Sequence, residues 1–173
     1  MVEIAVVLLF ISVGSRVAIN QVKGSLNAID ADVAAGTVAG QVQYARQLAI
    51  DRRRNMLLEF LNNNEIKITR QDAGGGTTVM SDVTLPSGFT FGLPSGLGDT
   101  PEGFGNASAV YFNGGTSGLF LGDGTFVTTS NVLVNGTVYT IGSGNPTARA
   151  VTLTASTGRV KQYSISGTTW VLR

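Results

Sequence analysis

The sequence of 173 residues contains no cysteine and no histidine. Without cysteine the chain can form no disulfide, so thiols give no information on the redox state of its compartment. The two absences also remove the commonest zinc ligands, and the imidazole base of Ser and Cys triads. The composition therefore points away from an enzyme, and we expect neither a cofactor nor a metal centre.

Charge is scarce, and its two signs balance. Twelve Lys and Arg residues stand against eleven Asp and Glu, so the net charge of +1 provides no overall attraction to nucleic acid or to an acidic membrane surface. Residues 1–72 hold 8 basic and 7 acidic residues, whereas residues 73–173 hold only 4 of each. Such low charge in the C-terminal part suits a domain that is packed by neighbours.

The N-terminus combines one acid with a long apolar run. Glu3 precedes an unbroken apolar stretch over residues 4–11, and apolar residues continue to Ile19. As a helix, residues 4–19 measure about 24 Å at ~1.5 Å per residue, which is a marginal length against a hydrocarbon core of roughly 30 Å. A carboxylate inside lipid is costly, so an acid at this position indicates a function that involves a partner.

Three simpler interpretations of this segment stay open. A secretory signal peptide carries basic residues before its apolar stretch and a small-residue cleavage site after it, whereas this chain starts with an acid and continues Gly-Ser-Arg. A buried core helix has one polar face, which residues 4–11 lack. A plain membrane anchor explains the hydrophobicity but gives Glu3 no role.

Helical periodicity continues beyond the apolar run. No proline occurs before Pro86, so a helix can extend from Glu3 to about Arg53, where a run of three arginines complements the helix dipole. The pairs Gly14-Ser15 and Gly24-Ser25 are the expected positions of a kink or helix break. One stripe is expected to face a core: Val22, Leu26, Ile29, Val33, Val38, Val42, Ala45, Leu48 and Ala49.

From Met56 the hydrophobic period changes to two. The run Asn62-Asn63-Asn64 predicts a hairpin turn between the first two strands, because asparagine tolerates positive φ. Residues 94–105 form the longest expected irregular loop. Strands are expected over residues 56–61, 65–70, 77–85, 89–93, 109–112, 118–121, 125–128, 131–134, 137–141, 151–155, 160–164 and 169–172.

One long helix followed by many short strands predicts an α+β fold. The second half of the helix is expected to pack on an antiparallel β-sheet domain. We divide the chain into an apolar helix over residues 1–25, its amphipathic continuation over 26–55 and a β-rich globular head over 56–173.

Four short segments resemble those of one family. Residues 1–4 read Met-Val-Glu-Ile, residues 45–53 form an Ala-containing helix end, residues 122–125 read Gly-Asp-Gly-Thr and residues 157–161 read Thr-Gly-Arg-Val-Lys. The first is similar to the last part of the Phe-Thr-Leu-Val-Glu segment that follows the processing site of pilin precursors. The others are similar to the helix end, a mid-domain turn and a closing strand. The chain thus resembles the type IV pilin-like proteins, and within them the GspH/FimT-type pseudopilins.

The resemblance implies a pilin-like fold and a structural subunit of a filament, either a type IV pilus or the pseudopilus of type II secretion. Implied partners are copies of the chain in a helical polymer, other pilins or pseudopilins, and the inner-membrane assembly platform. Implied locations are the bacterial inner membrane for the precursor and a periplasmic or extracellular filament, with a methylated N-terminus. Glu3 would pair with the α-amino group of an adjacent subunit. The implied subunit-interface residues are Glu3, Ile4, Val7, Leu8, Phe10 and Ile11.

A second function stays open beside this one. Some FimT-type proteins are thought to bind DNA through a Gly-Arg-x-Arg element, which residues 158–161 resemble with lysine in the last place. Arg159 and Lys161 are therefore candidate nucleic-acid contacts of a minor pilin in a DNA-uptake pilus. Two cations make a small electrostatic footprint, and two solvated strand residues are the simpler interpretation.

Three further positions carry weaker signals. Asp123, in the Gly-Asp-Gly-Thr segment, is a minor candidate for binding calcium. Asn106 and Asn135 fit the glycosylation acceptor pattern, and Asn135-Gly136 also fits a hairpin turn.

Overall fold

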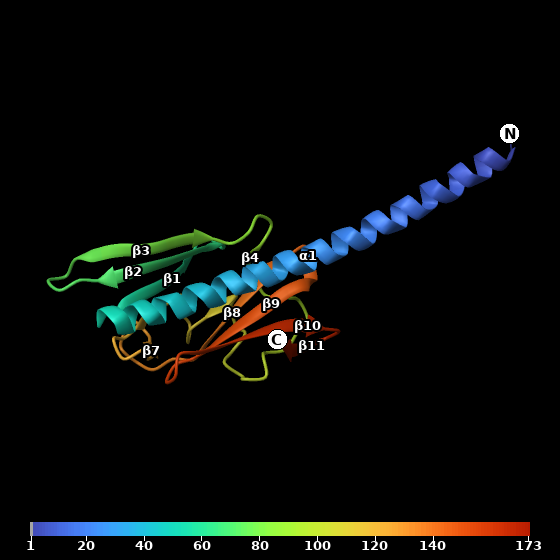
Figure 1. The fold of residues 1–173 in the computed structure, drawn as a ribbon. Coiled ribbons are helices and arrows are strands. Elements are labelled where there is room, and N and C mark those ends of the chain that lie inside the picture. The colour runs from blue at the N-terminus through green and yellow to red at the C-terminus, as the bar shows by residue number, and fades with distance from the viewer. Residues whose placement is uncertain (1) are drawn as a thin grey trace.

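The computed structural model describes the backbone of residues 2–173 and the side chains of residues 26–173. A single helix, α1 (Val2–Arg52), precedes all the strands of this part of the chain (Figure 1). The strands are β1 (Met56–Leu61), β2 (Glu65–Gln71), β3 (Thr77–Thr84), β4 (Thr90–Phe91), β5 (Val110–Tyr111), β6 (Ser117–Phe120), β7 (Phe126–Val127), β8 (Gly136–Gly142), β9 (Gly144–Thr154), β10 (Arg159–Ser166) and β11 (Thr169–Leu172).

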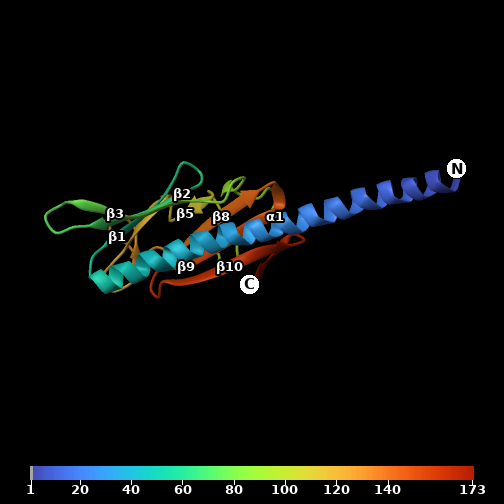
Figure 2. The same ribbon diagram turned by 45° about the horizontal axis from the view of Figure 1, so that its top comes forward.

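The helix is much longer than the head on which it packs. Its C-terminal half lies across the strands, and its N-terminal half extends past them into open space in both views (Figures 1 and 2). At the other end Arg53 adopts φ of +48°, Arg53 N–H donates to Ile50 O at 3.3 Å, and Arg54 N–H donates to Ala49 O at 3.2 Å. This is a Schellman motif, and it ends the helix where the sequence predicted.

The face of α1 that packs on the head differs from the predicted stripe. Leu26, Ile29 and Val33 were expected in the core but are exposed, and Val22 lies outside the described side chains. Val38 lies five residues after Val33 and therefore on a different face of the helix. The predicted stripe joined the two faces because it was built mainly from the large apolar residues. The buried face consists of Ala31, Ala34, Ala35, Val38, Ala39, Val42, Ala45, Leu48 and Ala49.

The α+β architecture is confirmed, with the antiparallel strands divided between two sheets. The N-terminal sheet has the order β3-β2-β1-β6-β7, and the C-terminal sheet has the order β11-β10-β9-β8-β4, with β5 also paired to β8. The helix contacts both, chiefly β9 and also β1, β8 and β10. Figure 1 shows β1 to β3 on one side of α1 and β9 to β11 on the other.

The strand predictions hold for most elements, and the Asn62-Asn63-Asn64 turn is confirmed. Asn62 and Asn63 have φ of +48° and +62°, and Leu61 pairs with Glu65 across the hairpin. The loop over residues 94–105 also contains no strand.

Three local predictions are wrong. Residues 131–134 form no strand, because a turn closed by the hydrogen bond from Asn131 N–H to Thr128 O leaves only an isolated bridge at Leu133. Asn135-Gly136 is not a hairpin turn, since Gly136 begins β8. Strand β9 starts at Gly144 rather than at residue 151, because Pro146 and Arg149 interrupt the apolar signal that marks its second half.

A chain of aromatic rings joins the two sheets beneath the helix. Phe60 on β1 lies 5.3 Å from Phe91 on β4 and 5.7 Å from Phe112, measured between ring centroids. Phe112 lies 5.1 Å from Phe126, which lies 4.8 Å from Phe120 on β6. Such edge and tilted contacts favour one relative placement of the sheets, and therefore one surface on which the helix can pack.

We expect Phe112→Ala to lower the free energy of unfolding by about 4 kcal/mol, because it removes a fully buried ring at the junction of the sheets. Val79→Ala, on exposed β3, should cost less than about 0.5 kcal/mol. Urea denaturation of the full chain in mild detergent measures both. Equal losses for the two variants would show that the ring does not join the sheets.

Candidate functional site

The predicted interface residues belong to the projecting half of α1 and lie outside the residues whose side chains the structure describes. They are Glu3, Ile4, Val7, Leu8, Phe10 and Ile11. The residues at which a helix break was predicted, Gly14, Ser15 and Gly24, also lie in this half, and the backbone of α1 is helical across all three. Their roles stay predictions. Within residues 26–173, no stretch of helix has both the length and the hydrophobicity needed to cross a bilayer.

Two glycine-containing turns pack against the last turns of α1. A Cβ atom on Gly124 would lie 2.8 Å from Ile50 Cδ1, and one on Gly158 would lie 2.2 Å from Arg46 Nε. Arg46 Nε also donates to Gly124 O at 3.2 Å. The helix end over residues 45–53 and the head turns over residues 122–125 and 157–161, three of the segments that carried the family resemblance, therefore meet.

Asp123 has a structural task in one of these turns. Its Oδ1 accepts hydrogen bonds from Thr125 N–H at 2.9 Å and from Thr125 Oγ1 at 2.6 Å. These bonds hold the pKa of the Asp123 carboxyl below its ordinary value. Over residues 26–173, no three acidic side chains come together to form a cation site, so the structure gives no support to calcium binding here.

An ion cluster ties the other end of the packed helix to the C-terminal sheet. The side chain of Arg149 on β9 is 6% exposed, and its Nε donates to Asp32 Oδ1 on α1 at 2.7 Å. The guanidinium also donates to Ala148 O at 2.9 Å and to Ala28 O at 3.4 Å. Arg173 forms a second ion pair with Asp32. The cluster lies at the N-terminal end of the part of α1 that packs on the head.

The charges of the cluster change the acidity of Asp32. Burial raises the pKa of its carboxyl, but the hydrogen bonds and positive charges of Arg173 and Arg149 outweigh burial, so that the pKa lies below the ordinary 3.8. A carboxyl with a lowered folded-state pKa stabilises the fold above that ordinary value. This contribution is lost as the pH falls through the pKa of the folded state.

We expect Asp32→Asn to lower the free energy of unfolding by about 2 kcal/mol at pH 7, because it leaves the buried Arg149 without its anion. The difference from the wild type should stay constant down to about pH 5 and shrink below pH 4, where Asp32 itself becomes protonated. Asp30→Asn is the matched control, since Asp30 is an exposed neighbour on α1.

Thermal unfolding between pH 3 and pH 7 measures this effect. If Asp30→Asn and Asp32→Asn behaved alike at every pH, the cluster would have no role in holding the helix.

The irregular loop over residues 94–105 covers the outer face of the C-terminal sheet. Tyr139 OH on β8 donates to Asp99 Oδ1 at 2.9 Å, and Trp170 Nε1 on β11 donates to Gly98 O at 2.9 Å. Tyr163 OH on β10 donates to Glu102, and burial together with this bond raises the pKa of Tyr163 to about 12. The loop is thus fixed by polar contacts that sequence periodicity could not show.

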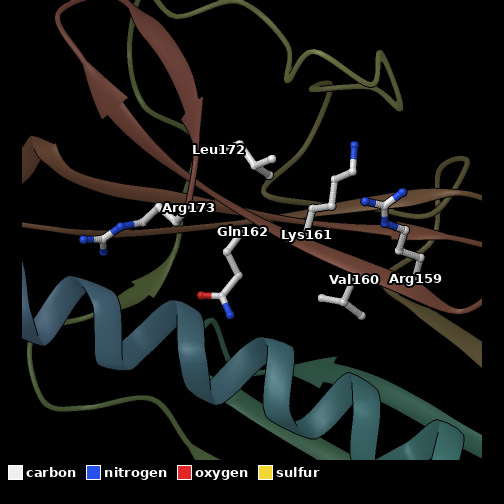
Figure 3. Close-up of a pocket in the computed structure, with 6 residues that line it drawn as sticks. All are labelled: Arg159, Val160, Lys161, Gln162, Leu172 and Arg173. Atoms are coloured by element: carbon white, nitrogen blue, oxygen red, sulfur yellow. The ribbon is translucent and has the colours of Figure 1, made fainter.

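The same loop engages one of the two candidate nucleic-acid contacts. Arg159 and Lys161 lie beside an open hollow of about 400 Å³ and point away from α1, whereas Gln162 points toward it (Figure 3). Lys161 Nζ forms an ion pair with Glu102 Oε1 at 2.5 Å. Among the side chains described, Arg159 forms no ion pair. Of the two candidate nucleic-acid contacts, Lys161 is therefore paired with an acid of the same chain, and Arg159 is the one whose charge is left for a ligand.

We expect the Lys161–Glu102 pair to keep the DNA affinity of this strand low. Glu102→Gln should raise the affinity for duplex DNA and steepen its salt dependence by about one released counterion, because Lys161 becomes available to a phosphate. Adding Lys161→Ala should reverse both changes. Fluorescence anisotropy between 50 and 200 mM salt measures them; an unchanged slope in Glu102→Gln would show that the pair does not limit binding.

Comparison with known proteins finds relatives by structure only. No protein-family model and no curated protein sequence matches the chain. The minor pseudopilin EpsH from the type 2 secretion system of Vibrio cholerae matches with a TM-score of 0.52 at 12% sequence identity, over 78% of this chain and 97% of that one. The type IV minor pilin FimU of Pseudomonas aeruginosa matches with a TM-score of 0.51 at 15% identity, over 80% of this chain and 90% of that one.

The chain has a pilin-like, GspH-type fold. The matched part of this chain corresponds to 97% and 90% of the two neighbours, which confirms the fold expected from the sequence resemblance. The sequence assigned no role to Asp32 or Arg149, although an arginine between two alanines at the start of an apolar strand was a signal that could have been read.

Proposed function

We propose that the chain is a structural subunit of a type IV pilus-like filament or of a type II secretion pseudopilus, and that it assembles through its N-terminal apolar helix. The observation that carries the proposal is the continuity of α1. One helix from Val2 to Arg52 is buried along its C-terminal half by the head and leaves its N-terminal half outside it. The match to a minor pseudopilin and a minor pilin supports the same role.

The projecting half needs a cover that the head does not provide. Residues 4–11 are apolar on every side, and each Å² of apolar surface removed from water contributes roughly 25 cal/mol. Before assembly the inner membrane is the available cover for this segment. In the filament the apolar helices of neighbouring subunits replace lipid as the cover, and the heads remain outside the bundle in the periplasm or beyond the cell.

Glu3 sets how neighbouring subunits align. A buried ion pair adds little net stability, because desolvation offsets its attraction, but a buried acid without its partner is penalised by several kcal/mol. The α-amino group of an adjacent subunit can act as the partner of Glu3. The apolar residues then supply adhesion, and the pair selects the one axial shift between subunits that satisfies both charges.

The head is suited to packing against other pilins and the assembly platform rather than to chemistry. Residues 73–173 carry only 4 basic and 4 acidic residues. Three of these four cations, Arg149, Lys161 and Arg173, form ion pairs within the chain. A surface with so little charge suits neighbouring heads packed side by side.

We expect the purified full-length chain to form filaments when the detergent is removed, as seen by negative-stain electron microscopy. Leu8→Arg should abolish them, because it places a charge in the apolar bundle. Val79→Arg, which adds the same charge to an exposed strand of the head, should leave them intact. The thermal midpoint of the head should be the same in all three proteins. Filaments formed equally well by Leu8→Arg would refute the proposal.

Glu3→Ala tests the second part of the mechanism. We expect its filament yield to fall at least about tenfold, because removing the acid leaves the amine of the neighbour buried without its partner. The axial rise between subunits should also become irregular. Unchanged yield and rise in Glu3→Ala filaments would show that the acid does not set the register.

A further inference from the structure

The C-terminal end of α1 holds more positive charge than the helix requires. A helix end carries a partial negative charge that one cation in the last turn complements, and Arg52 occupies that position. Arg53 and Arg54 follow it, and both are exposed. Among the side chains that the structure describes, neither of the two forms an ion pair. Their charges are therefore available to a ligand.

Arg53 occupies a position that favours glycine. The residue after the helix end in a Schellman motif has a left-handed backbone, which glycine adopts without strain and other residues adopt at a cost in stability. Arg53 has φ of +48°. Gly122 packs against this backbone, since a Cβ atom there would lie 3.2 Å from Arg53 C. An arginine kept at such a position points to a use for its guanidinium group.

The two arginines line a small hollow between the helix end and the N-terminal sheet. The hollow measures about 260 Å³, and its lining consists of Arg53, Arg54, Asn55, Gln71 and Asp72. Gln71 N–H donates to Asn55 O at 2.9 Å, which holds the start of β1 beside the end of β2. Two guanidinium groups and two carboxamides supply many N–H donors. Pockets for drug-sized ligands measure ~300–1,000 Å³, so this smaller hollow suits a small oxyanion.

The acid in the lining is satisfied by its neighbours. Asp72 Oδ1 accepts from Arg70 Nε at 2.5 Å, and Asp72 Oδ2 accepts from Thr78 Oγ1 at 2.7 Å. These bonds hold the pKa of the Asp72 carboxyl below its ordinary value, and the charge of Arg54 lowers it further. Because Arg70 balances Asp72, the charges of Arg53 and Arg54 are the uncompensated ones at the hollow.

We propose that this hollow binds a phosphate group with two negative charges, as inorganic phosphate or a phosphate monoester carries. Each guanidinium group can form paired hydrogen bonds to phosphate oxygens, a geometry that lysine does not provide. The neighbouring Asp51 and Arg52 carry opposite charges and add no net charge to the site. A phosphate diester, such as the backbone of nucleic acid, carries one charge and matches the two arginines less well. The site goes beyond the proposed filament role and is independent of it.

The position of the hollow limits the source of the phosphate. α1 ends on the side of the head opposite to its projecting half (Figures 1 and 2). The helix from residue 31, where burial begins, to residue 52 measures about 32 Å at ~1.5 Å per residue. A membrane that holds the apolar segment would be out of reach. The ligand is therefore free phosphate or a phosphate monoester on a soluble molecule.

Equilibrium dialysis with radiolabelled inorganic phosphate tests the site, using the full-length chain in mild detergent at pH 8, where the phosphate is a dianion. Arg53→Gly is the decisive variant, because it removes one guanidinium group and gives the left-handed position its favoured residue. We expect the phosphate affinity to fall at least about tenfold while the thermal midpoint stays the same or rises. A purely structural role for Arg53 would not lower the affinity. Absence of saturable phosphate binding by the native chain would overturn the proposal.

Two further variants control this experiment. Arg52→Gln removes an exposed arginine that does not line the hollow, and it should change the affinity by less than about twofold at 0.15 M salt. Asp72→Asn removes the negative charge from the lining and should raise the affinity at least about threefold. Equal losses in Arg52→Gln and Arg53→Gly would overturn the proposal, because general positive charge rather than the hollow would then attract the anion.

Competition with two soluble phosphate esters identifies the form of phosphate that binds. We expect glycerol 3-phosphate, a monoester, to displace the labelled phosphate, and dimethyl phosphate, a diester, to leave it bound at the same concentration. Displacement by unlabelled inorganic phosphate but not by glycerol 3-phosphate would assign the site to the free anion. Equal displacement by the diester would overturn the match between two negative charges and the two arginines.

Discussion

The packing of an alanine-rich helix face against two sheets is the constraint on which the rest of this molecule depends. Ala31, Ala34, Ala35, Ala39 and Ala45 are fully or almost fully buried, and their small side chains let the backbone of α1 lie close to the strands. The ion cluster of Asp32 fixes the near end of this contact, and the turns at Gly124 and Gly158 enclose the far end. Because the C-terminal half of α1 is fixed along its length, the N-terminal half can project from the head in only one direction.

That direction decides what the apolar N-terminal half can do. Because it continues the same helix, it projects from the head and presents its apolar surface to whatever lies outside. Lipid and the helices of other copies are the two environments that remove such a surface from water. In the proposed account, lipid surrounds the apolar half before assembly, and the helices of other copies surround it in the filament.

The sequence predicted the parts of the fold that depend on local signals. The helix end at Arg53, the turn at Asn62-Asn63-Asn64 and the α+β architecture follow from capping, turn chemistry and period. The face of the helix that is buried could not be predicted, because alanine carries little hydrophobic signal and the larger Leu26 and Ile29 pointed elsewhere. The pairing of Lys161 with Glu102 joins residues 59 positions apart, and no pattern in one sequence reveals such a contact. The interface residues of the apolar N-terminal half of α1 were predicted from the sequence and stay predictions.

Image reconstruction of filaments of the full-length chain tests the central claim most directly. The account predicts that α1 of every subunit runs unbroken from its head into a shared central bundle, with the heads arranged around it and no solvent along residues 4–19. A filament whose wall is built by contacts between heads, with the apolar segments outside the wall or absent from it, would contradict the account.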